Sequence, residues 1–545
     1  MTEVNGKRII ICCNAYPPNF IGGAELIAHF QAKILNEMGN KVIVFAGDST
    51  PYGDRYSFRR EDYDGLPVYR VHLIAKDYQN DCVNFFHPEV ESHFQHLLEE
   101  FCPDIVHFHN IIGLSVGMIH LAKKSGAKTI QTLHDNWGFC YKNTTIDNDG
   151  NVCNDYSKCS ECMAFIQDGE SKNIPIRLRQ DYLKMQFDDI DTYISPSQYL
   201  ADAYIRAGFP KEKIKVLWNG VDVERFSKVC RNNSNEIRFT YVGYFGNHKG
   251  VDVLISALPL IDSNQRVRIN LVGEGEAKGS YIEQLNNNHC INMVKFWGKV
   301  DNRNIEKVYR DTDVLVLPSI WPENQPVSIT EAMACGIPVI VSNIGGSVEL
   351  VEDGVTGYLF EPRNENDLAE KMDKIIQNPD TIQTFGENGY KKIQNVTFFN
   401  QVNKLLDIYN AGTTNQINVN PVIGIVGDRV NKNISLAIQK LSEDKCKYWF
   451  IKNEWFSDDQ LKRADLFCIA DDSNWLLPVI YALKNKIPLL VPEQNGELRK
   501  LCISASCGLY YSNYLEAAMC ITYLLGKDEI VNLIGSNGYC YLNNQ

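Results

Sequence analysis

Two glutamates in the middle of the chain are spaced so that their carboxylates could bind two ends of one polar ligand. Glu323 and Glu331 stand eight positions apart, directly after a run, 313–317, that predicts a strand. Prolines restrict the loop that carries Glu323, and Gly336 is typical of a helix end, so Glu331 falls in the first turns of a helix. A carboxylate accepts two hydrogen bonds side by side, so Glu331 could hold the paired hydroxyls of a ribose and Glu323 those of a sugar.

The start of that helix adds a second feature that suits a negatively charged ligand. Its backbone N–H groups would face a diphosphate, where the helix dipole favours negative charge. The residues expected to line this part of the site are Asn324, Gln325, Pro326 and Val327. The alternative is that Glu323 is a solvated loop residue and that Glu331 only complements the dipole, worth about 0.3–1 kcal/mol. The position of both acids directly after a strand favours a functional pair.

Glycine-bearing turns supply the candidate partners of a diphosphate. The turn 243–250 contains Gly243, His248 and Lys249, and the lysine can place a charge beside a diphosphate leaving group. The alternative is an ordinary solvated lysine. Gly22 and Gly23 follow the first predicted strand and would let backbone approach the phosphates from the opposite side, although a plain turn also uses glycine.

Histidines end two of the predicted strands. His134 follows the strand 128–133, and a site role is favoured because the carboxyl ends of parallel strands face the ligand cleft. The alternative is a histidine bound to Asp135 or to backbone. His107 and His109 alternate along a strand and share one face, where they could line an acceptor side or pack at the strand end.

The elements that must position these residues alternate as in doubly wound α/β domains. Two series of short β-branched runs predict two Rossmann-like lobes, 1–218 and 219–410, that face each other across a cleft. The expected strands are 8–13, 41–46, 104–108, 128–133, 190–194 and 213–217 in the first lobe, and 237–242, 267–272, 292–297, 313–317 and 338–342 in the second.

A third unit, 422–545, is predicted beyond a linker at 411–421 that has little to bury. This unit repeats the second lobe at an offset of about 150 residues. The run 336–340 matches 486–490, and 386–390 matches 535–539. Tyr481 stands opposite Glu331, and no counterpart of Glu323 occurs, so the unit is interpreted as a degenerate copy of the second lobe.

With these motifs, the chain resembles the retaining family 4 glycosyltransferases of GT-B fold over roughly residues 8–410. The family's Glu-x7-Glu motif corresponds to Glu323 and Glu331, and the apolar run 332–338 after it makes the match specific. The resemblance also includes 219–222, 243–250 and 22–25, of which the Gly-Gly pair of the last is a weak signal. The resemblance implies that Glu331 binds ribose, that Glu323 contacts the transferred sugar and that His134 lies near that sugar. It also implies retention of configuration by front-face attack, in which the leaving phosphate oxygen takes the acceptor proton.

The resemblance predicts a UDP- or GDP-sugar donor and a glycan or lipid-linked acceptor, in polysaccharide or cell-surface glycan synthesis. No catalytic cofactor is expected. Metal-dependent transferases commonly use Asp-x-Asp, and three such pairs occur here, 147–149, 189–191 and 311–313. The first lies in a turn-like run and the third precedes a strand rather than following it, and metal-independent transfer is predicted. The family's usual arginine near Tyr244 is absent, so His248 or another basic residue compensates, or the phosphate clamp is weaker.

Four cysteines within 23 residues form a separate candidate site: Cys140, Cys153, Cys159 and Cys162. The closing Cys-x2-Cys pair suits tetrahedral zinc, which four thiolates hold in closed structural sites. A zinc-pinned loop within the insertion 140–162 is the favoured hypothesis, ahead of free thiols and of disulfides.

Composition narrows the remaining choices. The 545 residues carry 67 acidic and 54 basic side chains, a net charge of −13 that disfavours nucleic acid as a partner. The first residues run directly into a predicted strand, which leaves no space for a secretory signal peptide. Seventeen cysteines in so long a chain are too few to indicate a disulfide-stabilised protein. A cytoplasmic protein is therefore expected, and peripheral attachment to a membrane stays possible. No pattern indicates an oligomeric state. Two rival functions stay open, a catalytically silent sugar-nucleotide-binding scaffold and a GT-B enzyme with phosphorylase or epimerase chemistry.

Overall fold

The computed structural model divides the chain into two compact units, residues 1–406 and 407–545, which are described separately. In both units the large sheets are built mainly from parallel strands. The structure describes residues 6–19, 22–50, 53–79, 85, 87–167, 173–261, 266–411, 422–426, 432–440, 447–451, 464–470, 475–525 and 528–543. Among these residues, no helix has both the length and the apolar character that a membrane crossing requires.

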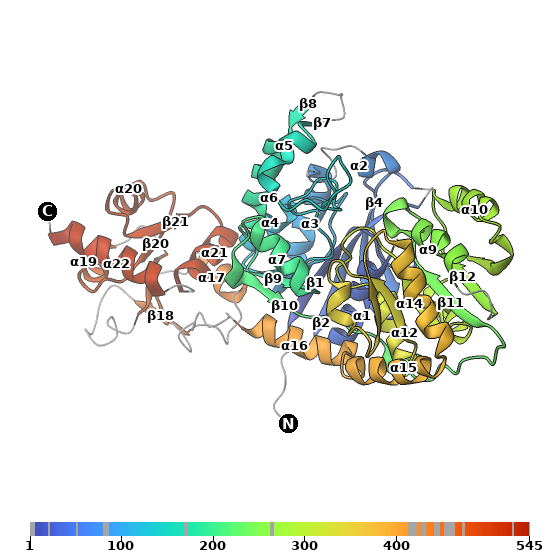
Figure 1. Cartoon of the computed structure of the whole chain (residues 1–545). Coiled ribbons are helices and arrows are strands. Elements are labelled where there is room, and N and C mark those ends of the chain that lie inside the picture. The colour runs from blue at the N-terminus through green and yellow to red at the C-terminus, as the bar shows by residue number, and fades with distance from the viewer. Residues whose placement is uncertain are drawn as a thin grey trace. The chain divides into compact units, whose positions relative to one another are not determined.

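The first lobe is an eight-stranded sheet in the order β10-β9-β6-β5-β1-β2-β4-β3 (Figure 1). Its strands are apolar over consecutive residues because helices cover both faces, and Ile9, Ile10 and Ile11 of the central strand are fully buried. The strands are β1 (Arg8–Cys13), β2 (Lys41–Asp48), β3 (Phe58–Tyr63), β4 (Leu66–His72), β5 (Ile105–Phe108), β6 (Lys128–Thr132), β9 (Thr192–Ser195) and β10 (Ile214–Val216). Only β3 runs antiparallel to its neighbour, β4.

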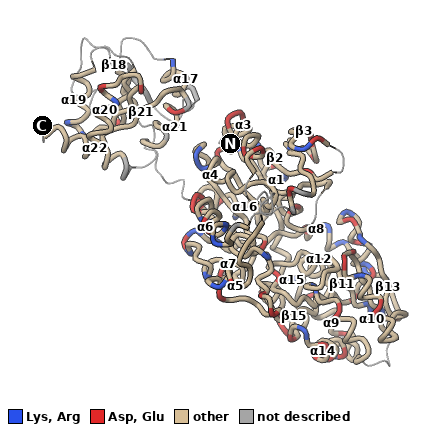
Figure 2. The backbone as a smooth tube through the Cα atoms, turned by 90° about the horizontal axis from the view of Figure 1, so that it is seen from above, with Lys and Arg blue, Asp and Glu red and all other residues tan. Residues whose placement is uncertain are grey.

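The helices of the first lobe are α1 (Gly23–Glu37), α2 (Ala75–Gln79), α3 (Pro88–Phe101), α4 (Gly117–Lys124), α6 (Ile176–Phe187) and α7 (Gln198–Arg206). An insertion between β6 and α6 carries the cysteine cluster and contains η1 (Tyr156–Lys158), α5 (Cys159–Cys162) and the hairpin of β7 (Phe165–Gln167) and β8 (Asn173–Pro175). Figure 2 shows acidic and basic residues interspersed around α5, α6 and α7.

The second lobe is a six-stranded parallel sheet in the order β13-β12-β11-β14-β15-β16. Its strands are β11 (Ile237–Val242), β12 (Val267–Val272), β13 (Val294–Gly298), β14 (Val314–Leu317), β15 (Val339–Ser342) and β16 (Gly357–Phe360). Short helices at the strand ends are α8 (Val223–Phe226), η3 (Asn247–Lys249), η6 (Asn302–Asn304), α11 (Glu306–Arg310) and α13 (Ser347–Leu350). Longer helices cover the sheet: α9 (Val251–Ala257), α10 (Lys278–Asn287), α12 (Val327–Ala334), α14 (Glu365–Gln377) and α15 (Asp380–Ile393).

The chain returns from the second lobe to the first through α16 (Phe398–Asn410). The ring of Phe398 stacks on that of Phe30 in α1, with 4.5 Å between the ring centres. Phe398 also packs against Gly220, where a Cβ atom would lie 2.5 Å from the Phe398 Cα atom. The chain therefore passes between the two lobes twice, and Phe398 lies where it returns to the first lobe.

The second unit contains a five-stranded parallel sheet in the order β18-β17-β19-β20-β21. This order repeats β12-β11-β14-β15-β16 of the second lobe. The strands are β17 (Val422–Val426), β18 (Lys447–Ile451), β19 (Leu466–Ile469), β20 (Leu489–Pro492) and β21 (Gly508–Tyr511), and the helices are α17 (Lys432–Lys440), α19 (Leu476–Lys484), α20 (Gly496–Ala505), α21 (Tyr514–Leu525) and α22 (Asp528–Asn543).

The matched sequence segments of the two sheets also pack alike. A Cβ atom on Gly386 would lie 2.0 Å from the carbonyl oxygen of Gly336, and one on Gly535 would lie 1.8 Å from the carbonyl oxygen of Lys486. In both sheets the last long helix therefore touches the turn after the equivalent helix, α12 or α19, at a position that admits only glycine. Of the expected linker, residues 412–421 lie outside the described residues, and the exact lobe boundaries stay a prediction.

Candidate active site

Glu323 is held by three donors on one side of its carboxylate. Its Oε1 atom accepts hydrogen bonds from Lys249 Nζ at 2.6 Å, Ser319 Oγ at 2.8 Å and Trp321 Nε1 at 2.8 Å. The side chains of Lys249 and Glu323 are only 18% and 11% exposed, so this ion pair is largely shielded from water. The other oxygen of Glu323 has no protein donor among these contacts and is the one that can meet a ligand.

The pKa of Glu323 lies below its ordinary value. Burial alone would raise it, but the charge and hydrogen bond of Lys249, with those of Trp321 and Ser319, outweigh burial. Glu323 is therefore a carboxylate at neutral pH. Its contribution to stability is present above the pKa of the unfolded chain and is lost as the pH falls through the lower pKa of the folded chain.

Lys249 is placed by a tight turn that joins two loops. Gly250 follows it with φ of +67°, and a Cβ atom at Gly250 would lie 2.0 Å from the carbonyl oxygen of Pro318. The backbone N–H of Ile320 donates to the carbonyl oxygen of His248 at 3.1 Å, and the His248 ring meets the Trp321 ring edge-on, 4.7 Å apart. The turn predicted to hold a phosphate thus docks on the loop that carries Glu323.

Glu331 lies on α12 and is 6% exposed. Tyr309 Oη donates to its Oε2 atom at 2.7 Å, and Asn302 Nδ2 donates to its Oε1 atom at 3.1 Å. Burial raises the pKa of Glu331, although these two hydrogen bonds and the charge of Arg225 oppose the shift. The two predicted glutamates therefore occupy different environments on one loop-and-helix unit, one paired with a cation and one held by neutral donors.

The loop between the glutamates ties the second lobe to the first. Asn324 Nδ2 donates to the carbonyl oxygen of His134 at 2.6 Å, and Gln325 exchanges two hydrogen bonds with the backbone of Asn219 at 2.6 and 3.2 Å. Pro326 is the N-cap of α12, and Val327 begins the helix. The Asn324 amide nitrogen and the Gln325 side chain are therefore used within the protein, whereas Asn324 Oδ1 is buried without a partner among the residues that the structure describes.

The glycines on the opposite wall meet this loop directly. A Cβ atom on Gly23 would lie 3.0 Å from Val327 Cγ2, so the start of α1 faces the start of α12. The backbone N–H of Gly22 donates to Glu25 Oε2 at 3.0 Å, so the Glu25 side chain caps the start of α1. Gly243 lies under the turn, where a Cβ atom would approach the Tyr241 hydroxyl to 2.6 Å. The structure thus places Gly23 beside the start of α12, which carries Glu331, and the turn with Lys249 beside the loop that carries Glu323.

The three histidines form a buried chain at the carboxyl ends of β5 and β6. His109 Nδ1 and His134 Nε2 are 2.9 Å apart, and His107 Nε2 lies 2.7 Å from Thr132 Oγ1. Burial lowers the pKa of His134 to about 4 and that of His107 to about 3, and it holds the pKa of His109 well below its ordinary value. All three rings are therefore neutral at neutral pH, and His134 can offer a sugar hydroxyl a hydrogen bond but no charge.

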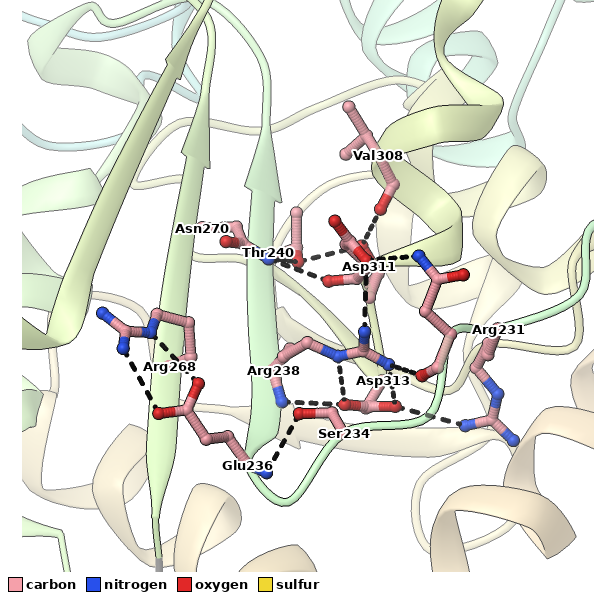
Figure 3. A network of polar contacts seen from close by, with 12 residues as sticks. Arg231, Ser234, Glu236, Arg238, Thr240, Arg268, Asn270, Val308, Asp311 and Asp313 are labelled. Carbon is pink, nitrogen blue, oxygen red and sulfur yellow. Dashed lines mark hydrogen bonds and ion pairs between the residues drawn. The ribbon is translucent and has the colours of Figure 1, made fainter.

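Two of the Asp-x-Asp pairs lie at the amino ends of the strands, away from the cleft. Asp313 binds Arg238 Nε at 2.9 Å, and Asp311 lies 3.3 Å from Arg238 Nη1 (Figure 3). Asp189 pairs with His120 and Asp191 with Lys123 on the first lobe. These carboxylates serve ion pairs that hold the strand starts together. The third pair, 147–149, lies in a turn of the insertion, as predicted.

The four cysteines of the insertion are neighbours. Burial first, and then the nearby thiols of Cys140, Cys153 and Cys162, raise the pKa of Cys159. Within the described residues, no group of three or more histidine, cysteine or acidic side chains is arranged to hold a metal ion. The structure therefore shows no zinc site, and the structural zinc stays a prediction.

Sequence reasoning did not identify Asn302 and Tyr309 as residues of this site. They come from η6 and α11, after β13, and no spacing in the sequence links them to Glu331. Ser319 and Trp321 could have been predicted as partners of Glu323, because they lie within four residues of it on the same loop.

Comparisons with known proteins match both lobes. A family model described as Glycosyltransferase Family 4 matches residues 21–225, and one described as Glycosyl transferases group 1 matches residues 222–392. An uncharacterized glycosyltransferase of Methanocaldococcus jannaschii is 25% identical over 383 residues, covering 66% of this chain and 87% of that protein. A glycogen synthase of Mycobacterium tuberculosis is 31% identical over 173 residues, covering 31% of this chain and 42% of the synthase.

Solved structures with the same fold cover the two lobes. Anabaena HepE in complex with UDP and glucose matches with a TM-score of 0.53 and 20% identity, covering 74% of this chain and 100% of HepE. The sucrose-phosphate synthase of Thermosynechococcus elongatus matches with a TM-score of 0.56 and 18% identity, covering 74% of this chain and 98% of the synthase. At this identity the likeness establishes the two-lobed GT-B fold.

Proposed function

Because the chain belongs to the group 1, family 4 glycosyltransferases, a retaining family that uses nucleotide-sugar donors, we propose that it transfers a sugar from a UDP- or GDP-sugar to a glycan or lipid-linked acceptor. The observation that carries the proposal is the shielded Lys249–Glu323 pair, 2.6 Å between Nζ and Oε1, on the same loop-and-helix unit as Glu331. Donor hydrolysis or transfer separates this proposal from the silent-scaffold alternative, which predicts tight donor binding without turnover. The HepE complex with UDP and glucose supports UDP as the first nucleotide to test.

In the proposed site each group acts on a different part of the donor. Glu331 binds the ribose hydroxyls, and the free oxygen of Glu323 binds hydroxyls of the transferred sugar. The glycines Gly22, Gly23 and Gly243 let backbone approach the diphosphate, beside Lys249 and His248. His134 faces the sugar from the first lobe.

The proposed reaction breaks the bond between the anomeric carbon and a phosphate oxygen of the donor. The acceptor hydroxyl attacks from the same face, its oxygen forms the new bond to the anomeric carbon, and its proton goes to the leaving phosphate oxygen. Negative charge grows on the diphosphate as the bond breaks, and Lys249 with the N–H groups at the start of α12 stabilises that charge in a shielded setting. No protein nucleophile is needed for retention by this route.

The direct test of this function is a screen of the purified protein against common UDP- and GDP-sugars for slow hydrolysis, with and without chelator. The family typically works without a metal, so we expect nucleoside diphosphate release from at least one donor, at the same rate when EDTA is present. Release that vanishes in EDTA and returns only with Mg²⁺ or Mn²⁺ would contradict metal-independent transfer. No release from any donor would count against the proposed donors.

We propose that residues 422–545 are a copy of the donor lobe that has lost the donor site. The shared strand order supports this origin, and Tyr481 stands on α19 where α12 has Glu331. The replacement of a carboxylate by a phenol removes the bidentate acceptor that a ribose would need.

Deletion of the chain after Gly412 is expected to leave donor hydrolysis unchanged, because both lobes and their hydrophobic cores lie before this point. The measurement is the initial rate of nucleoside diphosphate release by the truncated and the full-length proteins, after circular dichroism has shown that both are folded. A folded truncation without hydrolysis would show that the second unit takes part in donor turnover.

A further inference from the structure

The two hydrogen bonds that Glu331 receives leave part of its carboxylate free. An ionised carboxylate offers about four acceptor sites on its two oxygens. Tyr309 uses one site on Oε2 and Asn302 uses one on Oε1. Because each oxygen is fixed by one donor, the plane of the carboxylate is set, and the remaining lone pairs have a defined direction.

Arg225 determines which way the Asn302 amide faces. Arg225 Nη1 lies 3.2 Å from Asn302 Oδ1, and Arg225 Nη2 donates to the Asn302 carbonyl oxygen at 2.5 Å. A guanidinium can only donate, so the oxygen of the amide must face Arg225 and its nitrogen must face Glu331. The orientation of the Asn302 amide therefore follows from its contact with the Arg225 guanidinium.

Arg225 is itself held in place by two elements. Its Nε donates to Glu306 Oε1 of α11 at 2.5 Å, and its backbone N–H donates to Asp222 Oδ1 at the start of α8. The side chains of Arg225 and Glu306 are 22% and 24% exposed, so the pair is partly shielded from solvent. Tyr309 also lies on α11, with its ring packed edge-on against Phe226. One helix thus supports both donors of Glu331, one directly and one through Arg225.

We propose that Arg225, Asn302 and Tyr309 are positioning residues that aim the free lone pairs of Glu331 at the paired hydroxyls of the donor's ribose. This inference rests on the proposed function, since it needs a nucleotide at Glu331. Its consequence is selectivity for ribose, because a site that is built around two hydroxyls binds an analogue that lacks one of them poorly. The ratio of affinities for UDP and 2′-deoxy-UDP therefore measures whether the Glu331 carboxylate is oriented toward the ribose hydroxyls.

A purely structural role would give a different result for one conservative substitution. Asn302→Asp keeps the shape of the side chain and strengthens its contact with Arg225, but it replaces the amide donor to Glu331 by a second carboxylate. If Asn302 only fastens its loop to Arg225, this change leaves the preference for UDP over 2′-deoxy-UDP as it is. If Asn302 aims Glu331, two like charges about 3 Å apart repel, and Glu331 turns or takes up a proton.

The experiment measures Kd for UDP, GDP and 2′-deoxy-UDP by calorimetry on the full-length protein at pH 5 and pH 8. For Asn302→Asp we expect UDP affinity at pH 8 to fall about tenfold and the preference for UDP over 2′-deoxy-UDP to shrink. At pH 5 a proton shared by Asp and Glu restores a donor, so the ratio of variant to unmodified Kd should move back toward one. Arg225→Gln is expected to reduce the same preference.

Arg268→Gln is the matched control, because Arg268 makes a similar pair with Glu236, 3.2 Å apart, at the amino end of the same sheet (Figure 3). It should leave both affinities unchanged. If Asn302→Asp does not fold, Tyr309→Phe removes one donor to Glu331 and keeps the ring, and the same loss of preference is expected. Folded variants that bind UDP and 2′-deoxy-UDP as the unmodified protein does would overturn the inference and leave the proposed function standing. An unmodified protein that binds neither UDP nor GDP would overturn both.

Discussion

Replacement of Lys249 by methionine is expected to lower kcat for donor turnover by about 10²- to 10³-fold, the usual cost of removing one fixed group that stabilises charge in a transition state. Lys249 forms an ion pair with Glu323, with 2.6 Å between Nζ and Oε1, and its ammonium lies 4.6 Å from the centre of the Trp321 ring. Methionine keeps the length and apolar packing of the side chain but supplies no charge to the leaving diphosphate.

The Lys249→Met variant should also acquire a pH dependence that the unmodified protein lacks. Without the lysine, only the hydrogen bonds of Trp321 and Ser319 oppose the effect of burial, so the pKa of Glu323 should rise from its value in the unmodified protein. Residual activity should then rise with pH as Glu323 ionises, whereas in the unmodified protein Glu323 is ionised throughout the neutral range. The measurement is the pH profile of donor hydrolysis for both proteins.

Lys374→Met is the control for this substitution. Lys374 also combines an ion pair, 2.7 Å to Glu370, with a position near an aromatic ring, 5.8 Å from the centre of the Tyr358 ring, but it lies on α14 at the surface. It should turn over donor at the unmodified rate. Equal kcat values for folded Lys249→Met and Lys374→Met would contradict the role given to Lys249.

Replacement of Glu331 by glutamine is expected to weaken donor binding by about 10²-fold, with a smaller change in kcat. The change removes the charge and makes one end of the side chain a donor. If that end faces Asn302 Nδ2, two donors meet, and if it faces Tyr309 Oη, the phenol oxygen can accept but its own proton loses its acceptor. Because the ribose is distant from the breaking bond, the loss should appear in Kd and KM first.

Glu236→Gln serves as the control for Glu331→Gln, since Glu236 pairs with Arg268 at the far end of the sheet. Calorimetry with UDP and steady-state kinetics separate the two effects. A folded Glu331→Gln variant with unchanged KM and unchanged UDP affinity would show that Glu331 does not bind the nucleotide.

The sequence predicted most of the parallel core because buried parallel strands are apolar along their whole length. Strands 8–13, 237–242 and 267–272 were predicted with the bounds that the structure has. The hairpin of β3 and β4 was missed, since Phe58–Tyr63 is charged at four of its six positions and lies at the edge of the sheet. β16 was missed because it is a strand of four residues that begins with glycine.

The candidate site was predictable where its residues are close in sequence and not where the fold brings them together. Glu323 and Glu331 stand on one loop and helix, so spacing alone identified them. The ion pair of Glu323 with Lys249 spans 74 positions, and that of Arg225 with Glu306 spans 81, so neither could be read from a pattern. The lowered histidine pKa values likewise depend on burial at the cleft, which spacing does not reveal.

The measurement that tests the central claim most directly is the rate of nucleoside diphosphate release from the donor that the screen identifies, for the unmodified protein and for Glu323→Ala and Glu331→Ala variants shown to be folded. If the two carboxylates bind the sugar and the ribose of one donor, both variants should release it, at a donor concentration below KM, at about a hundredth of the unmodified rate or less. Folded variants that both turn over every donor at the unmodified rate would contradict the account.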